Sequence, residues 1–315
     1  MSRIVIGIHG LGNKPPKQVL RKHWKRSLYD GFRMLGHPWK PFRFEMVYWA
    51  DLMNPLPYDP AEGDRKSPLY DDEPYVPPST MNHEKPSMIR KKVVEFLERE
   101  MTSIFLNSDL SVNFDAVTSR IIRHYFRELD MYYCANCTVG RKSGVYVKDV
   151  LRERLIRILQ RYRRQKILLI GHSMGSIIAY DALSLASPDI EVDTFITIGS
   201  PLGVPVVISK IAGEQQQKRN LEHMEKPRVP EAVTGAWLNF SDIEDNMTVN
   251  YRLSNDFAKN SKGIEIVDTV VSNEYAYEGK PNPHKAYGYL RTPEVARAVL
   301  SFIARPEKDR LRLTA

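Results

Sequence analysis

The chain has 315 residues, 42% of them hydrophobic and 27% charged, which is enough apolar material for a substantial core. Its 46 basic and 38 acidic residues give a net charge of +8, and no zinc finger, RNP signature or basic heptad accompanies the short basic clusters such as residues 161–166. We therefore expect no nucleic-acid partner. No run approaches the roughly 18 apolar residues that a membrane span requires.

The apolar run at residues 4–8 is too short for a signal peptide and lacks its basic flank and cleavage site, so we expect a cytoplasmic protein. The two cysteines, Cys134 and Cys137, exclude a disulfide framework. Their C-x-x-C spacing leaves open a redox pair or half of a zinc site, as well as chance spacing on a helix or loop.

The first elements in the chain are a strand, a helix and a second strand. Residues 3–8 form a continuous apolar run, typical of a strand buried on both faces. After a glycine-rich turn, residues 17–32 place Leu20, Trp24 and Leu28 on one helical face. Residues 42–49 are predicted to form the second strand.

Residues 52–86 change in character, because eight prolines occur among acidic and tyrosine residues and exclude regular helix or central strand. Helical periodicity returns over residues 88–131. We interpret residues 52–145 as a cap inserted into one domain that spans residues 1–315. No internal repeat is evident.

The remaining elements alternate between helix and strand, which predicts a mostly parallel sheet flanked by helices. The predicted helices span residues 145–164 and 174–187 and begin again at Pro293, and the predicted strands span residues 166–170, 194–198, 236–240 and 264–271. Residues 204–232 are interpreted as a smaller, polar excursion.

The sequence Gly-His-Ser-Met-Gly at residues 171–175 follows a predicted strand directly and precedes a predicted helix. A serine on so sharp a turn needs glycine on both sides, because a Cβ atom there would clash. The helix N-terminus behind it favours developing negative charge. Ser173 is therefore predicted to be a nucleophile, the alternative being a glycine-rich structural turn.

This segment resembles the α/β-hydrolase superfamily, in particular its lipase- and esterase-like members, and the His9-Gly10 turn after the first strand strengthens the resemblance. The resemblance implies an oxyanion hole formed by the backbone N–H groups of Leu11 and Met174. It also implies a shortened N-terminus, because residues 3–8 correspond to the third strand of the full fold. We expect His9, Gly10 and Trp49 to contribute to the substrate side of the site.

The superfamily's chain order of serine, acid and histidine implies the other members of a triad. Of the two histidines after Ser173, His284 lies between the last predicted strand and the last helix, whereas His223 lies in a polar stretch. His284 is the predicted general base. Asp245 is the favoured acid, and Asp242 remains an alternative.

The predicted function is that of a serine hydrolase that cleaves a carboxylic ester, lipid-like or thioester, through an acyl-enzyme intermediate. Such chemistry needs no metal or organic cofactor. The expected partner is a small-molecule ester or lipid, a basic surface is compatible with peripheral membrane contact, and the sequence does not indicate an oligomeric state. The competing interpretation is a catalytically silent binding protein that kept the fold.

Overall fold

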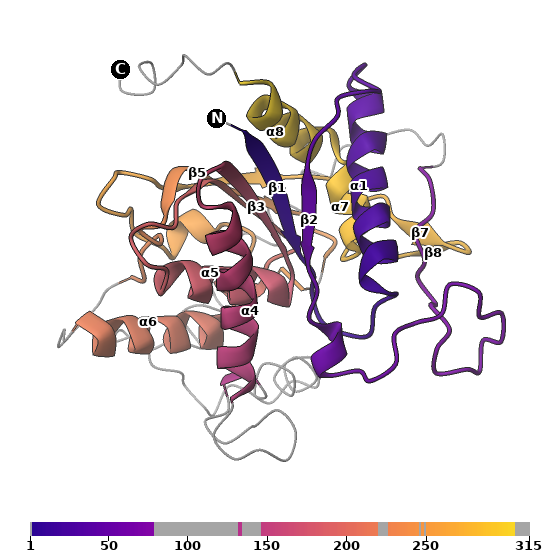
Figure 1. Ribbon diagram of the computed structural model, residues 1–315, viewed down its shortest axis with the longest axis horizontal. Helices are drawn as coiled ribbons and strands as arrows, with labels where there is room; N and C mark the ends of the chain where they lie inside the picture. The colour runs from indigo at the N-terminus through magenta and orange to yellow at the C-terminus, as the bar shows by residue number, and fades with distance from the viewer. Residues whose placement is uncertain are drawn as a thin grey trace.

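A computed structural model describes residues 2–78, 132–133, 146–219, 226–245, 247–248 and 250–305. Its centre is a six-stranded sheet in the order β2-β1-β3-β4-β5-β6, and every neighbouring pair is parallel (Figure 1). The strands are β1 (Arg3–Ile8), β2 (Phe44–Val47), β3 (Lys166–His172), β4 (Val192–Ile198), β5 (Val233–Ser241) and β6 (Ile266–Val270).

The continuous apolar runs form strands because both faces of the sheet are covered. In β3, Ile167 and Leu169 belong to one buried cluster, whereas Leu168 and Ile170 belong to the cluster on the other face. Successive side chains of a strand point to opposite faces, so a strand between two helical layers must be apolar at every position.

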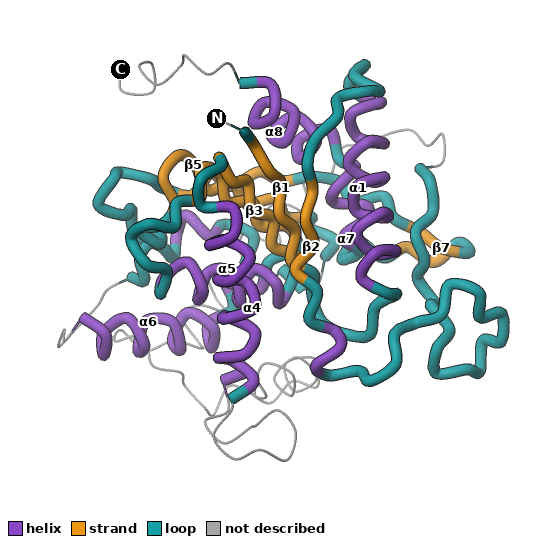
Figure 2. The backbone as a smooth tube through the Cα atoms, in the orientation of Figure 1, coloured by secondary structure: helices purple, strands orange, loops and turns teal. Residues whose placement is uncertain are grey.

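Helices cover both faces of the sheet (Figure 2). One cluster contains the buried sides of α4 (Val147–Tyr162), α5 (Met174–Ser184) and α6 (Pro205–Arg219). The other contains those of α1 (Lys17–Met34), α7 (Ala286–Arg291) and α8 (Pro293–Ala304). The prediction of a mostly parallel sheet flanked by helices is confirmed.

The structure differs from the sequence prediction at several element boundaries and in residues 204–232. β2 is limited to Phe44–Val47 instead of residues 42–49, and α5 ends at Ser184, before the predicted residue 187. Residues 204–232 were interpreted as a polar excursion, but they begin with α6, which buries Val207 and Ile211 against the sheet.

The proline-rich stretch has the irregular backbone that its composition predicts. After the 3-10 helix η1 (Ala50–Leu52), residues 53–78 contain no helix or strand. The rest of the predicted cap, including the periodic residues 88–131 and the pair Cys134 and Cys137, lies outside the described residues apart from residues 132–133.

Short elements complete the described parts of the fold: η3 (Pro201–Gly203), η4 (Leu253–Asn255) and the hairpin of β7 (Ala276–Tyr277) and β8 (Lys280–Pro281). Across the described ranges, no helix combines the length and apolar character needed to cross a membrane.

Candidate active site

The predicted site residues lie at the carboxyl edge of the sheet, next to its topological switch point. β1 and β3 are neighbours, and the chain continues from them in opposite directions, to β2 and to β4. In open parallel sheets this arrangement leaves a crevice beyond the strand ends, where ligands bind. The turn after β1, which contains Gly10, meets the turn that carries Ser173 in this crevice. A Cβ atom on Gly10 would lie 2.7 Å from the Cβ of Ser173.

The backbone at Ser173 is strained, with φ 52° and ψ −129°. Such a conformation costs a non-glycine residue about 1–3 kcal/mol and is concentrated at functional sites. The flanking glycines allow the turn to close. A Cβ atom on Gly171 would lie 2.8 Å from the Cα of Ser176, and one on Gly175 would lie 2.5 Å from the carbonyl oxygen of Ile8.

Ser173, His284 and Asp245 form one line of hydrogen bonds. His284 Nε2 lies 2.9 Å from Ser173 Oγ, and His284 Nδ1 lies 2.9 and 3.1 Å from the two carboxylate oxygens of Asp245. Because a carboxylate only accepts, Nδ1 carries the proton and Nε2 is left to accept the Ser173 hydroxyl. Ser173 follows β3, Asp245 follows β5, and His284 lies in the segment after β6.

Further donors hold the carboxylate of Asp245, whose side chain is fully buried. The Tyr289 hydroxyl donates to Oδ2 at 2.7 Å, and the Met247 N–H donates to Oδ1 at 2.9 Å. Burial, together with the nearby charge of Asp245, raises the pKa of Tyr289 well above its usual value, so its hydroxyl stays protonated and donates. The carboxylate is thus fixed in the orientation that His284 requires.

Asp242, the alternative acid, contacts backbone groups instead of His284. Its two oxygens accept from the N–H groups of Glu244 at 2.8 Å and Asn273 at 2.6 Å. Burial is the main cause that raises the pKa of Asp242 to about 6. This side chain ties the segment after β5 to the segment after β6, whereas Asp245 is the acid that the structure places beside the imidazole.

His172 supports the position of His284. Its Nε2 lies 2.7 Å from the His284 carbonyl oxygen, to which it donates, and the two rings are 4.9 Å apart. Burial and the neighbouring His284 lower the pKa of His172 well below its usual value. His172 is therefore neutral and adds no positive charge next to the imidazole of His284.

The predicted oxyanion donors are the N–H groups of Leu11 and Met174. Within the described ranges, neither N–H donates to another protein group, so both are available to a ligand. The Lys14 ammonium group donates to the carbonyl oxygens of Leu11, of Gly12 at 3.1 Å and of Asn13 at 3.0 Å. Because all three carbonyl oxygens bind the same ammonium group, the conformation of the loop after β1 is fixed.

His9 and Trp49 support the same loop from beneath. The His9 Nδ1 donates to the Gly10 carbonyl at 2.7 Å, and its Nε2 accepts the Trp49 N–H at 3.0 Å. The rings of His9 and Trp49 stack with centroids 4.8 Å apart. Burial lowers the pKa of His9 to about 3. Trp49 was expected at the substrate pocket, but it is buried behind His9 and does not line the cavity.

A cavity of about 440 Å³ opens beside Ser173 and His284, within the size range of small-molecule sites. Its lining is mixed. The apolar and aromatic residues include Leu20, Trp24, Tyr58, Ala286 and Tyr287, and the polar residues include Asn13, Lys14, Asp71, Glu73, Asn282 and Lys285. The cap segment closes one wall, because the Glu73 carboxylate accepts from Asn282 at 2.5 Å and from Lys285 at 3.0 Å, on either side of His284.

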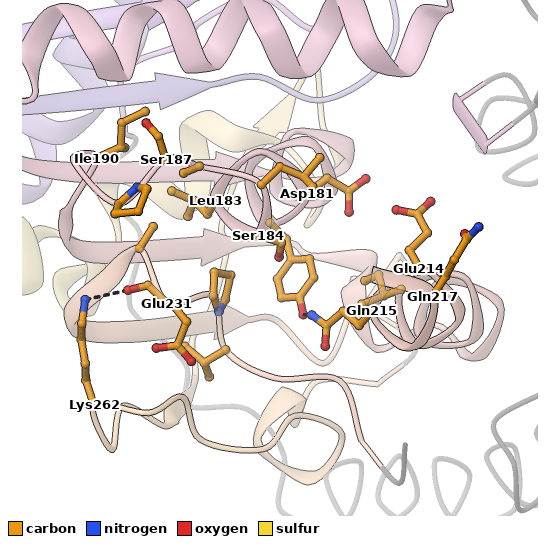
Figure 3. Close-up of a pocket in the computed structure, with 18 residues that line it drawn as sticks. Asp181, Leu183, Ser184, Ser187, Ile190, Glu214, Gln215, Gln217, Glu231 and Lys262 are labelled. Carbon is orange, nitrogen blue, oxygen red and sulfur yellow. Dashed lines mark hydrogen bonds between the residues drawn. The ribbon is translucent and has the colours of Figure 1, made fainter. Parts of the chain in front are cut away.

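A second cavity, of about 750 Å³, lies at the other end of α5 (Figure 3). Leu183 and Ser187 line it from the end of α5, and Gln215 lines it from α6. Across it, Lys262 donates to the carbonyl oxygen of Glu231. It includes none of the predicted site residues, so its larger volume does not make it the reactive centre.

Among the residues that the structure describes, no three His, Cys, Asp or Glu side chains are grouped to hold a metal ion. Sequence reasoning missed Tyr289, Glu73 and the support from His172. Tyr289 lies in α7, a helix that the sequence analysis did not predict, and Glu73 reaches His284's loop only through the tertiary fold. For these three residues, the only indication in the sequence is that His172 directly precedes Ser173 in the Gly-His-Ser-Met-Gly motif.

Comparison with protein families assigns this fold. A family described as "PGAP1-like alpha/beta domain" matches residues 124–281, which is half of the chain. The sheet and the match place the protein in the α/β-hydrolase-like class. The chain belongs to the PGAP1-like alpha/beta domain family. The match includes Ser173 and Asp245 and ends three residues before His284. No curated protein sequence matches the chain.

Proposed function

We propose that the protein is a serine hydrolase that cleaves carboxylic esters, including lipid-like esters or thioesters, through an acyl-enzyme intermediate. The observation that carries the proposal is the unbroken line of hydrogen bonds from Ser173 through His284 to Asp245. Nucleophile and base lie within hydrogen-bond reach, and a third group orients the base, which is the arrangement that activates a hydroxyl for acyl transfer.

In the first half-reaction, Ser173 Oγ attacks the ester carbonyl carbon while His284 Nε2 takes the hydroxyl proton. The carbonyl π electrons move to oxygen, and the N–H groups of Leu11 and Met174 stabilise the resulting oxyanion. Asp245 stabilises the imidazolium without taking its proton. The intermediate then collapses: the bond to the leaving oxygen breaks, and His284 donates its proton to the departing alcohol.

In the second half-reaction, water attacks the acyl carbon and passes a proton to His284. The same two N–H groups stabilise the second oxyanion. When this intermediate collapses, the bond to Ser173 Oγ breaks, the proton returns from His284 to Ser173, and the carboxylic acid leaves. The protein ends in its starting protonation state, and the net reaction consumes one water.

The cavity supports an ester with an apolar part. Leu20, Trp24 and Tyr287 offer a surface for an acyl chain or another apolar group beside Ser173. Residues 52–145 would act as a cap within a single domain, and Tyr58 and Glu73, from its described part, line the cavity. In this proposal the cap sets which esters reach Ser173.

Labelling with a fluorophosphonate probe tests the proposal, because the probe reacts covalently with an activated serine. We expect wild-type protein to be labelled and Ser173→Ala to remain unlabelled. Ser187→Ala, which removes an exposed hydroxyl at the far end of α5, is the matched control and should label like wild type. If folded wild-type protein shows no labelling that depends on Ser173, the hydrolase proposal is wrong and the silent binding protein is favoured.

A further inference from the structure

The net charge of the protein is concentrated in one segment. The basic segment, which we define as residues 17–43, consists of α1 and the loop that leads to β2, and it has eight basic residues against one acidic residue, Asp30. Its net charge is therefore +7, whereas the whole chain carries +8. The short basic cluster at residues 161–166, one of several along the chain, does not account for this excess. Most of this segment is α1, which lies on the outside of the sheet (Figure 1).

Several of these cations have no ion-pair partner among the residues that the structure describes. Lys17 pairs with Glu45 at 2.9 Å, and Arg33 pairs with Asp30 at 2.7 Å. Lys22, Arg26 and Lys40 are exposed and form no ion pair with a carboxylate in the described parts of the chain. Neighbouring cations without counter-charges repel one another, so an external anionic surface would stabilise them.

An exposed tryptophan lies in the same segment. Trp39 has 83% of its surface exposed, Met34 at the end of α1 has 41% exposed, and residues 36–41 are exposed throughout. The other tryptophans, Trp24, Trp49 and Trp237, are all buried. Indole is enriched at membrane–water interfaces, where its apolar ring and polar N–H both find partners.

We propose that the basic segment docks the protein on a membrane surface that contains anionic phospholipid, with Trp39 inserted at headgroup level and Lys22, Arg26 and Lys40 above the phosphate groups. Charge attraction and burial of an aromatic ring act together in this mode of binding. The contact lies along α1 and does not involve Ser173, His284 or Asp245, so it is independent of the proposed hydrolase function.

Vesicle binding read out by tryptophan fluorescence tests the proposal on the full chain. Because Trp39 is the exposed tryptophan, iodide quenching of the free protein should report mainly on it. Vesicles of phosphatidylcholine with phosphatidylserine should shift the emission to the blue and protect it from iodide, and pure phosphatidylcholine should do neither. In about 1 M salt, where the Debye length falls to about 3 Å, binding should weaken strongly.

Variants locate the contact. Each basic residue at an anionic membrane contributes about fivefold to binding, so Lys22→Glu/Lys40→Glu should weaken the partition constant by at least about 25-fold. Trp39→Ala should also lose affinity, measured by co-sedimentation. The matched controls are Arg157→Glu/Arg161→Glu on α4 and Leu56→Ala, an exposed apolar residue elsewhere, and both should bind like wild type. All variants should keep wild-type activity on a soluble ester.

Two results would overturn the proposal. One is equal binding of phosphatidylcholine vesicles with and without phosphatidylserine, or no binding of either. The other is wild-type vesicle affinity of the folded Trp39→Ala and Lys22→Glu/Lys40→Glu proteins. If homopolymeric RNA binds with the same dependence on Lys22 and Lys40 and vesicles do not bind, the basic segment is a nucleic-acid surface and the membrane proposal is wrong.

Discussion

At the scale of single residues, Asp245 and Asp242 differ in what surrounds them more than in where they lie in the chain. Asp245 contacts an imidazole and a tyrosine hydroxyl, whereas Asp242 binds two backbone N–H groups. Tyr289 links the two, since its hydroxyl donates to Asp245 and accepts from the Asp242 N–H at 2.9 Å. One carboxylate therefore orients the imidazole of His284, the proposed base, and the other orders the loops that carry Asp245 and His284.

This difference predicts opposite outcomes for two matched substitutions. Asp245→Asn should lower kcat for ester hydrolysis by about 10⁴-fold, because the amide no longer fixes the imidazole tautomer or stabilises the imidazolium. Asp242→Asn should retain most of the activity and lose stability, because an amide offers one acceptor where the carboxylate offers two. Steady-state kinetics and urea unfolding measure both. Equal losses of kcat in folded proteins would argue against Asp245 as the orienting acid.

His9 gives a pH-dependent stability. Its folded pKa is about 3, below the usual 6.5, so the unfolded state binds more protons between these values. The stabilisation is fully present above pH 6.5 and falls by up to about 1.4 kcal/mol for each pH unit below it. His9→Gln, which keeps one donor and one acceptor, should lose about 2 kcal/mol less than wild type between pH 6.5 and about pH 4.5. Urea unfolding at both pH values measures the free energy of unfolding of each protein. An equal decrease in wild type and His9→Gln would contradict the prediction.

At the scale of the elements, α5 approaches the end of β1 closely beside Ser173. A Cβ atom on Gly175 would lie 2.5 Å from the Ile8 carbonyl oxygen and 2.6 Å from that of His9. Both neighbours are backbone atoms, and β1 is held by parallel pairing to β2 and β3. Neither element has room to shift without moving the turns that carry Gly10 and Ser173.

Two glycine-to-alanine substitutions in helices should therefore have opposite signs. Gly175→Ala should destabilise the fold by about 1–3 kcal/mol, as overpacking does, and should also lower kcat. Gly213→Ala in α6, where an added Cβ would meet nothing within 4 Å, should stabilise by about 0.5–1 kcal/mol through helix propensity. Thermal and urea unfolding measure the stability of both variants relative to wild type. If Gly175→Ala is as stable as wild type, α5 can move away from β1 and the prediction is wrong.

The elements that sequence predicts well are those whose patterns are local. β1 and β3 follow from continuous apolar runs, and the turn at Ser173 follows from its glycines. α6 was missed because its apolar residues lie in the first half, before the polar residues 213–217. The choice between Asp245 and Asp242 was left open because both follow β5, and only the packing of α7 against that loop separates them.

At the scale of the whole molecule, the sheet brings together segments that are distant in the chain. The parallel strands end at one edge, so the segments after β1, β3, β5 and β6 meet around one cavity. The proline-rich stretch then joins this edge from outside the sheet, and its Glu73 binds Asn282 and Lys285, which flank His284 in the loop. The order of the strands, more than any single motif, places His284 beside Ser173.

The contact of Glu73 predicts that the cap segment affects the reaction. Glu73→Ala removes the acceptor for Asn282 and Lys285, so His284 should be less well held and kcat/KM should fall about tenfold, equivalent to about 1.4 kcal/mol. Glu62→Ala, in the same segment but without a contact to this loop, is the control and should leave kcat/KM unchanged. Kinetics with one soluble ester suffice, and equal kcat/KM for the two variants would rule out this role for Glu73.

The central claim is that Ser173 becomes acylated, and mass spectrometry of quenched turnover mixtures measures this directly. With a slowly deacylating ester, the intact mass should rise by the mass of the acyl group minus one hydrogen, and peptide mapping should place the group on Ser173. The account is contradicted if the protein hydrolyses the ester with no acyl group on Ser173, or with the acyl group on another residue.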